Sequence, residues 1–195
     1  PALLVAAAFW WLLATALVLA YPASAAFWKP RGVALLIGLL ILLPAWQGLV
    51  LLKQWPQGNQ LILLVMLLVW LADIGAYFTG RAFGRRKLAP SISPGKSWEG
   101  AYGAIVGVGV YGLACLSYVG YPLGEPGRLL LALVGLVAFT AVSIIGDLFE
   151  SLVKRQAGVK DSGTLLPGHG GILDRIDSLT STLPLADLVV LWIAK

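Results

Sequence analysis

Six runs of about 20 mostly apolar residues dominate the sequence and leave little choice of fold. A run of this length can cross the hydrocarbon core of a membrane as one helix. Only 12% of the 195 residues are charged, whereas soluble domains carry about a quarter. The sequence therefore predicts an all-α polytopic membrane protein, a bundle of about six transmembrane helices. The predicted spans are residues 3–20, 32–52, 59–80, 98–118, 129–149 and, shorter than the rest, 179–194.

Basic residues are concentrated on one side of these predicted spans. Loops 21–31, 81–97 and 150–178 share a side if every span is real, and they hold 11 of the 14 Lys and Arg residues. Such loops lie in the cytoplasm, because membrane proteins retain positive loops on that side. The net charge of +5 is thus explained by topology, and we expect no nucleic-acid partner. The sequence shows no soluble domain and no internal repeat.

Residues 146–178 form the more informative of two polar segments, GDLFESLVKRQAGVKDSGTLLPGHGGILDRIDS. Asp147 and Glu150 are three residues apart and share a helix face, and Asp174 and Asp177 repeat that spacing. Oxygen ligands suit Mg²⁺, Mn²⁺ or Ca²⁺ better than zinc, and ionisable groups at membrane depth are functional candidates. Cations interleaved with glycines complete the pattern of a metal–phosphate site, although topology alone also explains basic residues at a cytoplasmic helix end. These cations are Lys154, Arg155, Lys160 and Arg175, and Asp161 lies among them.

The other polar segment, residues 73–100, reads DIGAYFTGRAFGRRKLAPSISPGKSWEG. Its five cations predict further phosphate contacts, but a basic patch that attracts anionic lipid is an equally simple reading. Asp73 lies inside the third span, where either a site role or a structural pair with Arg81 explains it. His169 is the only histidine, and its position among glycines leaves turn hydrogen bonding and phosphate contact both open. Neither a P-loop nor a dinucleotide fingerprint is complete, because Pro90 and Leu173 stand where glycines are required.

The run SLVKRQAGVKDSGTLLPGHGGILDRIDS is similar to the signature of the CDP-diacylglycerol synthase (phosphatidate cytidylyltransferase) family. The stretch ADIGAYFTGRAFGRRKLAPSISPGKSWEG looks like the second shared stretch of that family, so the resemblance covers about residues 60–182 and points to its C-terminal catalytic portion. The signature positions are filled by Ser151, Lys154, Arg155, Lys160, Asp161, His169, Gly170, Gly171, Asp174, Arg175 and Asp177.

The resemblance implies an all-helical membrane bundle, often a homodimer, with its polar catalytic cavity open to the cytoplasm. It implies transfer of CMP from CTP to phosphatidic acid, giving CDP-diacylglycerol and pyrophosphate for phospholipid synthesis. It also implies dependence on Mg²⁺ held by Asp147 and Asp174, with K⁺ as a candidate at a second position. We therefore expect an enzyme of a bacterial cytoplasmic (inner) membrane, with two N-terminal spans in residues 1–58 and a catalytic transmembrane domain in 59–195.

These roles are hypotheses for individual residues. The predicted catalytic residues are Asp147, Asp161, Asp174, Asp177 and Lys160. The predicted substrate- and phosphate-binding residues are Arg81, Ser93, Lys96, Ser151, Lys154, Arg155, His169 and Arg175. A CTP-dependent lipid kinase of the polyprenol or phytol type is the closest alternative, and a transporter for anionic solutes is a more distant one.

Overall fold

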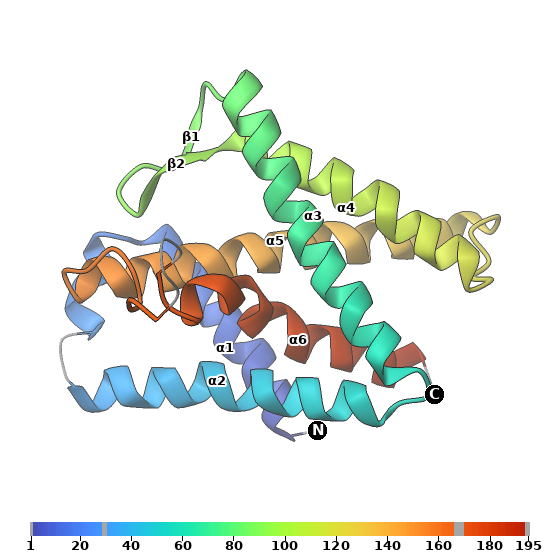
Figure 1. Cartoon of the computed structure of the whole chain (residues 1–195), viewed down its shortest axis with the longest axis horizontal. Coiled ribbons are helices and arrows are strands. Elements are labelled where there is room, and N and C mark those ends of the chain that lie inside the picture. The colour runs from blue at the N-terminus through green and yellow to red at the C-terminus, as the bar shows by residue number, and fades with distance from the viewer. Residues whose placement is uncertain (1, 29–30, 166–169, 194–195) are drawn as a thin grey trace.

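The computed structural model describes residues 2–28, 31–165 and 170–193 of the chain. Its long helices run alongside or across one another, as Figure 1 shows. They are α1 (Ala2–Leu19), α2 (Arg31–Gln54), α3 (Gly58–Phe83), α4 (Trp98–Tyr118), α5 (Pro126–Gln156) and α6 (Leu173–Ile193). A 3₁₀ helix, η1 (Ala23–Trp28), follows α1. Between α3 and α4, strand β1 (Lys87–Ala89) pairs antiparallel with β2 (Ser93–Ser97).

Five helices, α1 to α5, are long and apolar enough to cross a membrane, within the described part of the chain. The predicted helical membrane protein is thereby confirmed in its broad class. The sixth predicted span corresponds to α6, which is not among the five. Three aspartates and Arg175 lie on α6 and lower its hydropathy.

The structure corrects the predicted boundaries around the polar segments. Helix α5 continues seven residues beyond the predicted end at residue 149, and α6 begins six residues before the predicted start at residue 179. Hydropathy detects only the apolar part of such a helix, so its charged ends were assigned to loops. The one short exception to the helical fold, within the described residues, is the β1–β2 hairpin.

Close backbone packing joins α3 to α4. A Cβ added at Gly75 would lie 2.8 Å from the carbonyl oxygen of Gly103, and a Cβ at Gly103 would lie 2.0 Å from the Thr79 side chain. Small residues are what allow helices to approach this closely in lipid. Elsewhere, the rings of Trp10 and Trp11 on α1 pack edge to face against the ring of Phe149 on α5. The distances between ring centroids are 5.6 and 5.8 Å.

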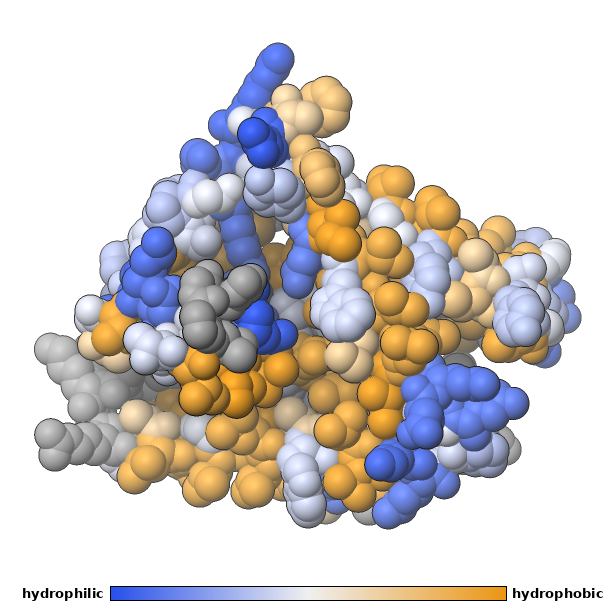
Figure 2. Space-filling model, in the orientation of Figure 1, coloured by the Kyte–Doolittle hydropathy of each residue, from blue (hydrophilic) through white to orange (hydrophobic). Residues whose placement is uncertain are grey.

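The connections divide between two ends of the molecule. The segment after α1, the hairpin and the loop after α5 lie at one end, and the α2–α3 and α4–α5 connections lie at the other (Figure 1). Hydrophilic residues gather at these ends with hydrophobic surface between them (Figure 2). The three basic loops therefore share one end, as the alternation of the predicted spans requires. The division of the chain at residue 58 stays a prediction.

Candidate active site

A cavity of about 580 Å³ lies between α3, the hairpin, α4 and α5. The hairpin is held against α4 because Trp98 N–H donates to Arg86 O at 2.9 Å and the Ser97 hydroxyl accepts from Gly100 N–H at 3.2 Å. Glu99 adds two more contacts by accepting from the backbone N–H groups of Arg85 and Arg86. Charged and hydroxyl side chains from the hairpin, α3 and α5 line the cavity wall. They include Asp73, Tyr77, Arg81, Ser93, Lys96, Ser97 and Asp147.

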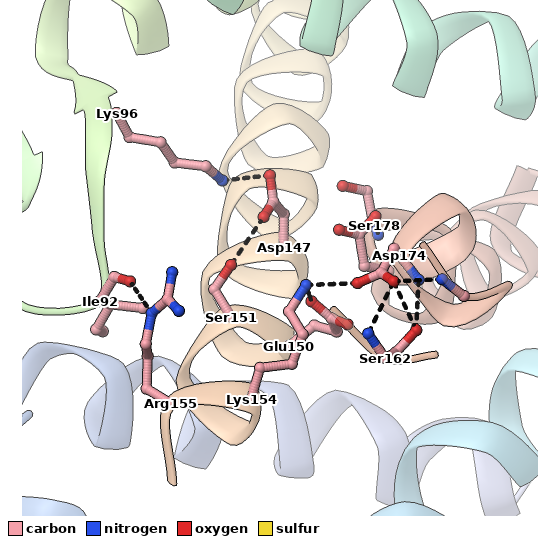
Figure 3. Close-up of polar contacts among 12 residues, drawn as sticks. Ile92, Lys96, Asp147, Glu150, Ser151, Lys154, Arg155, Ser162, Asp174 and Ser178 are labelled. Carbon is pink, nitrogen blue, oxygen red and sulfur yellow. Dashed lines mark hydrogen bonds and ion pairs between the residues drawn. The ribbon is translucent and has the colours of Figure 1, made fainter. Parts of the chain in front are cut away.

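Lys96 and Asp147 form an ion pair across this cavity. Lys96 extends from β2, and its Nζ donates to Oδ2 of Asp147 on α5 (Figure 3). The hydroxyl of Ser151, one helical turn further on, approaches the other carboxylate oxygen at 3.4 Å. Both charged side chains stay partly open, with 25% of Lys96 and 27% of Asp147 exposed. Asp147 is thus an accessible carboxylate with one ammonium partner.

A second cluster, the Lys154 triad, consists of Lys154, Glu150 and Asp174. Lys154 Nζ lies 2.5 Å from Glu150 Oε2 and 2.6 Å from Asp174 Oδ1, so it joins α5 to the start of α6 (Figure 3). The exposed fractions of these side chains are only 16%, 7% and 6%. A buried carboxylate needs such a cation, because removing its charge from water is costly.

Asp174 also organises the loop before α6. Its Oδ2 accepts from the N–H and the hydroxyl of Ser162, both at 2.8 Å, and from Gly171 N–H at 2.7 Å. Burial opposes ionisation of Asp174, but the hydrogen bonds from Lys154, Gly171 and Ser162 outweigh it and hold the pKa of this carboxyl well below its usual range. Gly170 adopts a positive φ of 81°, and a Cβ there would lie 2.6 Å from Asp174 Oδ2. The glycine-rich loop is thus folded around this carboxylate.

Two further carboxylates, Asp73 and Asp177, lie close enough to Asp147 to be affected by its charge. Asp73, on α3, is within range of the charges of Asp147, Lys96 and Arg175. Burial raises the pKa of Asp177 to about 7, and the nearby charges of Asp147 and Asp73 act in the same direction. Several carboxylates close together favour the binding of a cation.

The structure brings together only part of the predicted residue set. Ser93 and Arg81 line the cavity, where the Arg81 guanidinium donates to the Tyr77 hydroxyl at 3.1 Å. The pairing of Arg81 with Tyr77 gives no support to a structural Asp73–Arg81 pair. Arg155 Nε donates to the backbone oxygen of Ile92 at 3.3 Å.

The other predicted residues lie on the loop before α6 or at its start. Lys160 and Asp161 are exposed on that loop, with Asp161 beside Gly170, and Arg175 is exposed on α6. His169 lies outside the described residues.

Asp73 and Ser162 contribute to the site but were not among the predicted site residues. Asp73 lines the cavity with Asp147, and its signal was an acidic residue inside an apolar run. Ser162 supplies two contacts to Asp174, and only its place in the polar run KDSG could have suggested it. A serine in a polar loop is too common for sequence alone to single it out.

The donor chemistry suits a hard divalent cation. The cavity offers the carboxylates of Asp147 and Asp73 and the hydroxyl of Ser93, all of them oxygen donors of the kind that Mg²⁺ prefers. Within the described residues, no group of three Asp, Glu, His or Cys side chains forms a ready-made metal cage. Substrate oxygens and water would have to complete the coordination, which is usual for Mg²⁺.

Together these features define a class: an integral membrane protein of packed helices whose polar end carries paired lysines and carboxylates. Phosphate groups and a divalent cation are the ligands that this combination favours. Comparison with known protein families identifies the class more closely.

The profile described as "Cytidylyltransferase family" matches residues 1–193, and the chain belongs to this family. The family resemblance found in the sequence is therefore confirmed. A Pseudomonas aeruginosa protein named phosphatidate cytidylyltransferase is 60% identical over 193 residues, which are 99% of this chain and 70% of that protein. A Haemophilus influenzae protein of the same name is 46% identical over 189 residues, 93% of this chain and 66% of that protein. A Brucella suis protein, also so named, is 50% identical over 130 residues, 67% of this chain and 46% of that protein.

Proposed function

We propose that the chain transfers CMP from CTP to phosphatidic acid, forming CDP-diacylglycerol and pyrophosphate for phospholipid synthesis. The names of its relatives, up to 60% identical over nearly the whole chain, support this activity. The structural observation that carries the proposal is the cavity in which Lys96 and Asp147 meet. It offers both signs of charge beside helices whose outer faces are apolar, so a nucleotide and a lipid headgroup can meet there.

The membrane side of this cavity is formed by α3. Tyr77 lines the cavity and is 58% exposed, and its neighbours Ile74 and Phe78 are 51% and 64% exposed. Aromatic residues of this kind favour the membrane–water interface. The lipid headgroup therefore enters sideways past α3, while its acyl chains stay in the bilayer, and CTP enters from the aqueous side.

The chemistry is an in-line displacement at phosphorus. A phosphate oxygen of phosphatidic acid forms a bond to the α-phosphorus of CTP, and the bond from that phosphorus to the β-phosphate bridging oxygen breaks. The nucleophile is already an anion, so no strong general base is required. Lys96 and Arg81 hold the phosphates, while Ser93 donates a hydrogen bond, and these groups reduce the repulsion between the two anionic reactants.

Mg²⁺ is the cation that we propose for this site, with Asp147 as its principal ligand and Asp73 beside it. When bound, it would neutralise charge on the triphosphate. Asp174 stays a predicted ligand, and its Oδ1 already accepts a hydrogen bond from Lys154. Asp177 and Asp161 are proposed to support the site electrostatically, and a K⁺ ion is the candidate for a second position.

The setting of the enzyme is also a proposal. The three basic loops at one end support a cytoplasmic orientation of the site, in the inner membrane of a bacterium. The membrane character and the bacterial relatives support that location. The homodimer implied by the family resemblance is part of the same proposal.

A product assay in detergent micelles tests the activity. Full-length protein would be given phosphatidic acid, Mg²⁺ and CTP labelled on either the α- or the γ-phosphate. We expect the α-label to appear in the lipid fraction and pyrophosphate to be released. Label transfer from the γ-position alone would establish a lipid kinase instead, and absence of either label from lipid would overturn the proposal.

A further inference from the structure

The two carboxylates that the sequence predicts as metal ligands are both occupied by lysine. Lys96 pairs with Asp147, and Lys154 pairs with Asp174. In the first pair one lysine contacts one carboxylate, and about a quarter of each side chain is exposed. Both residues line the cavity. Lys154 instead forms ion pairs with two carboxylates, Glu150 and Asp174, whose side chains are each more than nine-tenths buried. The two lysines therefore differ in how easily each can leave its partner.

We propose that Lys96 is the exchangeable counter-ion of Asp147, which leaves the carboxylate when a divalent cation binds and then turns to the substrate phosphates. Lys154 does not exchange, because its departure would leave Glu150 and Asp174 buried without a cation. This inference rests on the proposed function, but its test needs no CMP transfer. The exchange replaces one cation by another at Asp147, and no proton or covalent bond changes.

Electrostatics gives the exchange a direction. A divalent cation attracts a carboxylate more strongly than an ammonium does, and carboxylate oxygens are its preferred ligands. The released ammonium stays beside the cavity because β2 is anchored to β1 and to α4. Metal and ammonium together then leave excess positive charge, which a triphosphate neutralises. Lys96 should therefore oppose binding of the metal alone and favour binding of the metal with nucleotide.

The first experiment measures Mn²⁺ binding to full-length protein by electron paramagnetic resonance, with no substrate present. We expect Lys96→Gln to bind Mn²⁺ about three- to tenfold more tightly than wild type, as expected for removing a partly exposed competing charge. Lys96→Arg should keep wild-type affinity. Lys87→Gln removes the same charge from an exposed hairpin residue that does not line the cavity, so it is the matched control and should also behave as wild type.

Adding CTP without phosphatidic acid should cancel the effect. The increase in Mn²⁺ affinity that CTP produces in wild type should be smaller in Lys96→Gln by a similar factor. A merely structural role for Lys96 would weaken binding in both conditions. Unchanged or weaker binding of Mn²⁺ alone, in a Lys96→Gln protein that melts at the wild-type temperature, would overturn the proposal.

A second measurement needs no variant. The rate at which an amine-acylating reagent labels each lysine of the wild-type protein would be followed by mass spectrometry, with and without Mg²⁺. Lys96 should react faster once Mg²⁺ binds, while Lys154 and Lys87 should not change. A constant Lys96 rate at Mg²⁺ concentrations that saturate binding would contradict the exchange, even if CMP transfer is normal.

Discussion

Two lysine–carboxylate clusters lie less than three helical turns apart on α5, and they differ in burial more than in chemistry. The Lys96–Asp147 pair joins β2 to α5, opens onto the cavity and keeps about a quarter of each side chain exposed. The Lys154 triad joins α5 to α6 and is almost closed to solvent. The comparison shows that lysine–carboxylate pairs can either take part in the reaction or stabilise the fold. Exposure to the cavity distinguishes the two roles.

Lys154→Met should produce the largest effect on stability. It leaves Glu150 and Asp174 buried without their cation, which typically costs about 3–5 kcal/mol. Thermal unfolding of the detergent-solubilised protein would measure it, with Lys96→Met as the matched variant in the open pair. We expect Lys96→Met to cost less than about 1 kcal/mol. Equal losses in the two variants would break the distinction between the clusters.

Ser162→Ala tests how the triad holds the loop before α6. The Ser162 hydroxyl donates to Asp174 Oδ2 at 2.8 Å and accepts from Asp174 N–H at 3.3 Å. Its loss should cost about 1–2 kcal/mol and speed hydrogen exchange in residues 158–165. Thr164→Val, at an exposed position on the same loop, is the control. Unchanged exchange in Ser162→Ala would mean that Asp174 does not organise this loop.

Arg155→Gln should have the smallest effect. The hydrogen bond from Arg155 Nε to Ile92 O is 3.3 Å long and the residue is exposed, so its loss should cost less than about 1 kcal/mol. We expect the turnover rate to change by less than about threefold in the micelle assay. A fall in turnover as large as the one caused by substituting Lys96 would indicate that Arg155 contacts the substrate. The substrate-binding site would then extend beyond the cavity that Lys96 lines.

The helical membrane fold could be predicted because lipid requires long apolar helices, and long apolar runs are visible in one sequence. The grouping of basic loops at one end followed from the alternation of the predicted spans, and their charge agreed with it. The β1–β2 hairpin could not be predicted in the same way. It is short, lies between charged residues and depends on contacts with α4, such as the Trp98 N–H to Arg86 O bond.

The composition of the candidate site was more predictable than its pairing. Spacing placed Asp147 and Glu150 on one helix face, and the family signature singled out Asp174. The partners depend on how α5, α6 and the hairpin meet in space, so no spacing rule gives Lys96 to Asp147 across 51 residues. Nor does spacing reveal that Lys154 forms ion pairs with both Glu150 and Asp174.

Asp147→Asn in the label-transfer assay tests the central claim most directly. The substitution keeps the shape of the side chain and removes the charge that faces the cavity. At saturating Mg²⁺ we predict that transfer of α-label to phosphatidic acid falls by about 100-fold or more, with an unchanged melting temperature. Glu125→Gln, at the exposed Arg128 ion pair on the α4–α5 connection, should keep normal transfer. Near-normal turnover in Asp147→Asn would contradict the account, because the open carboxylate would then have no part in the reaction.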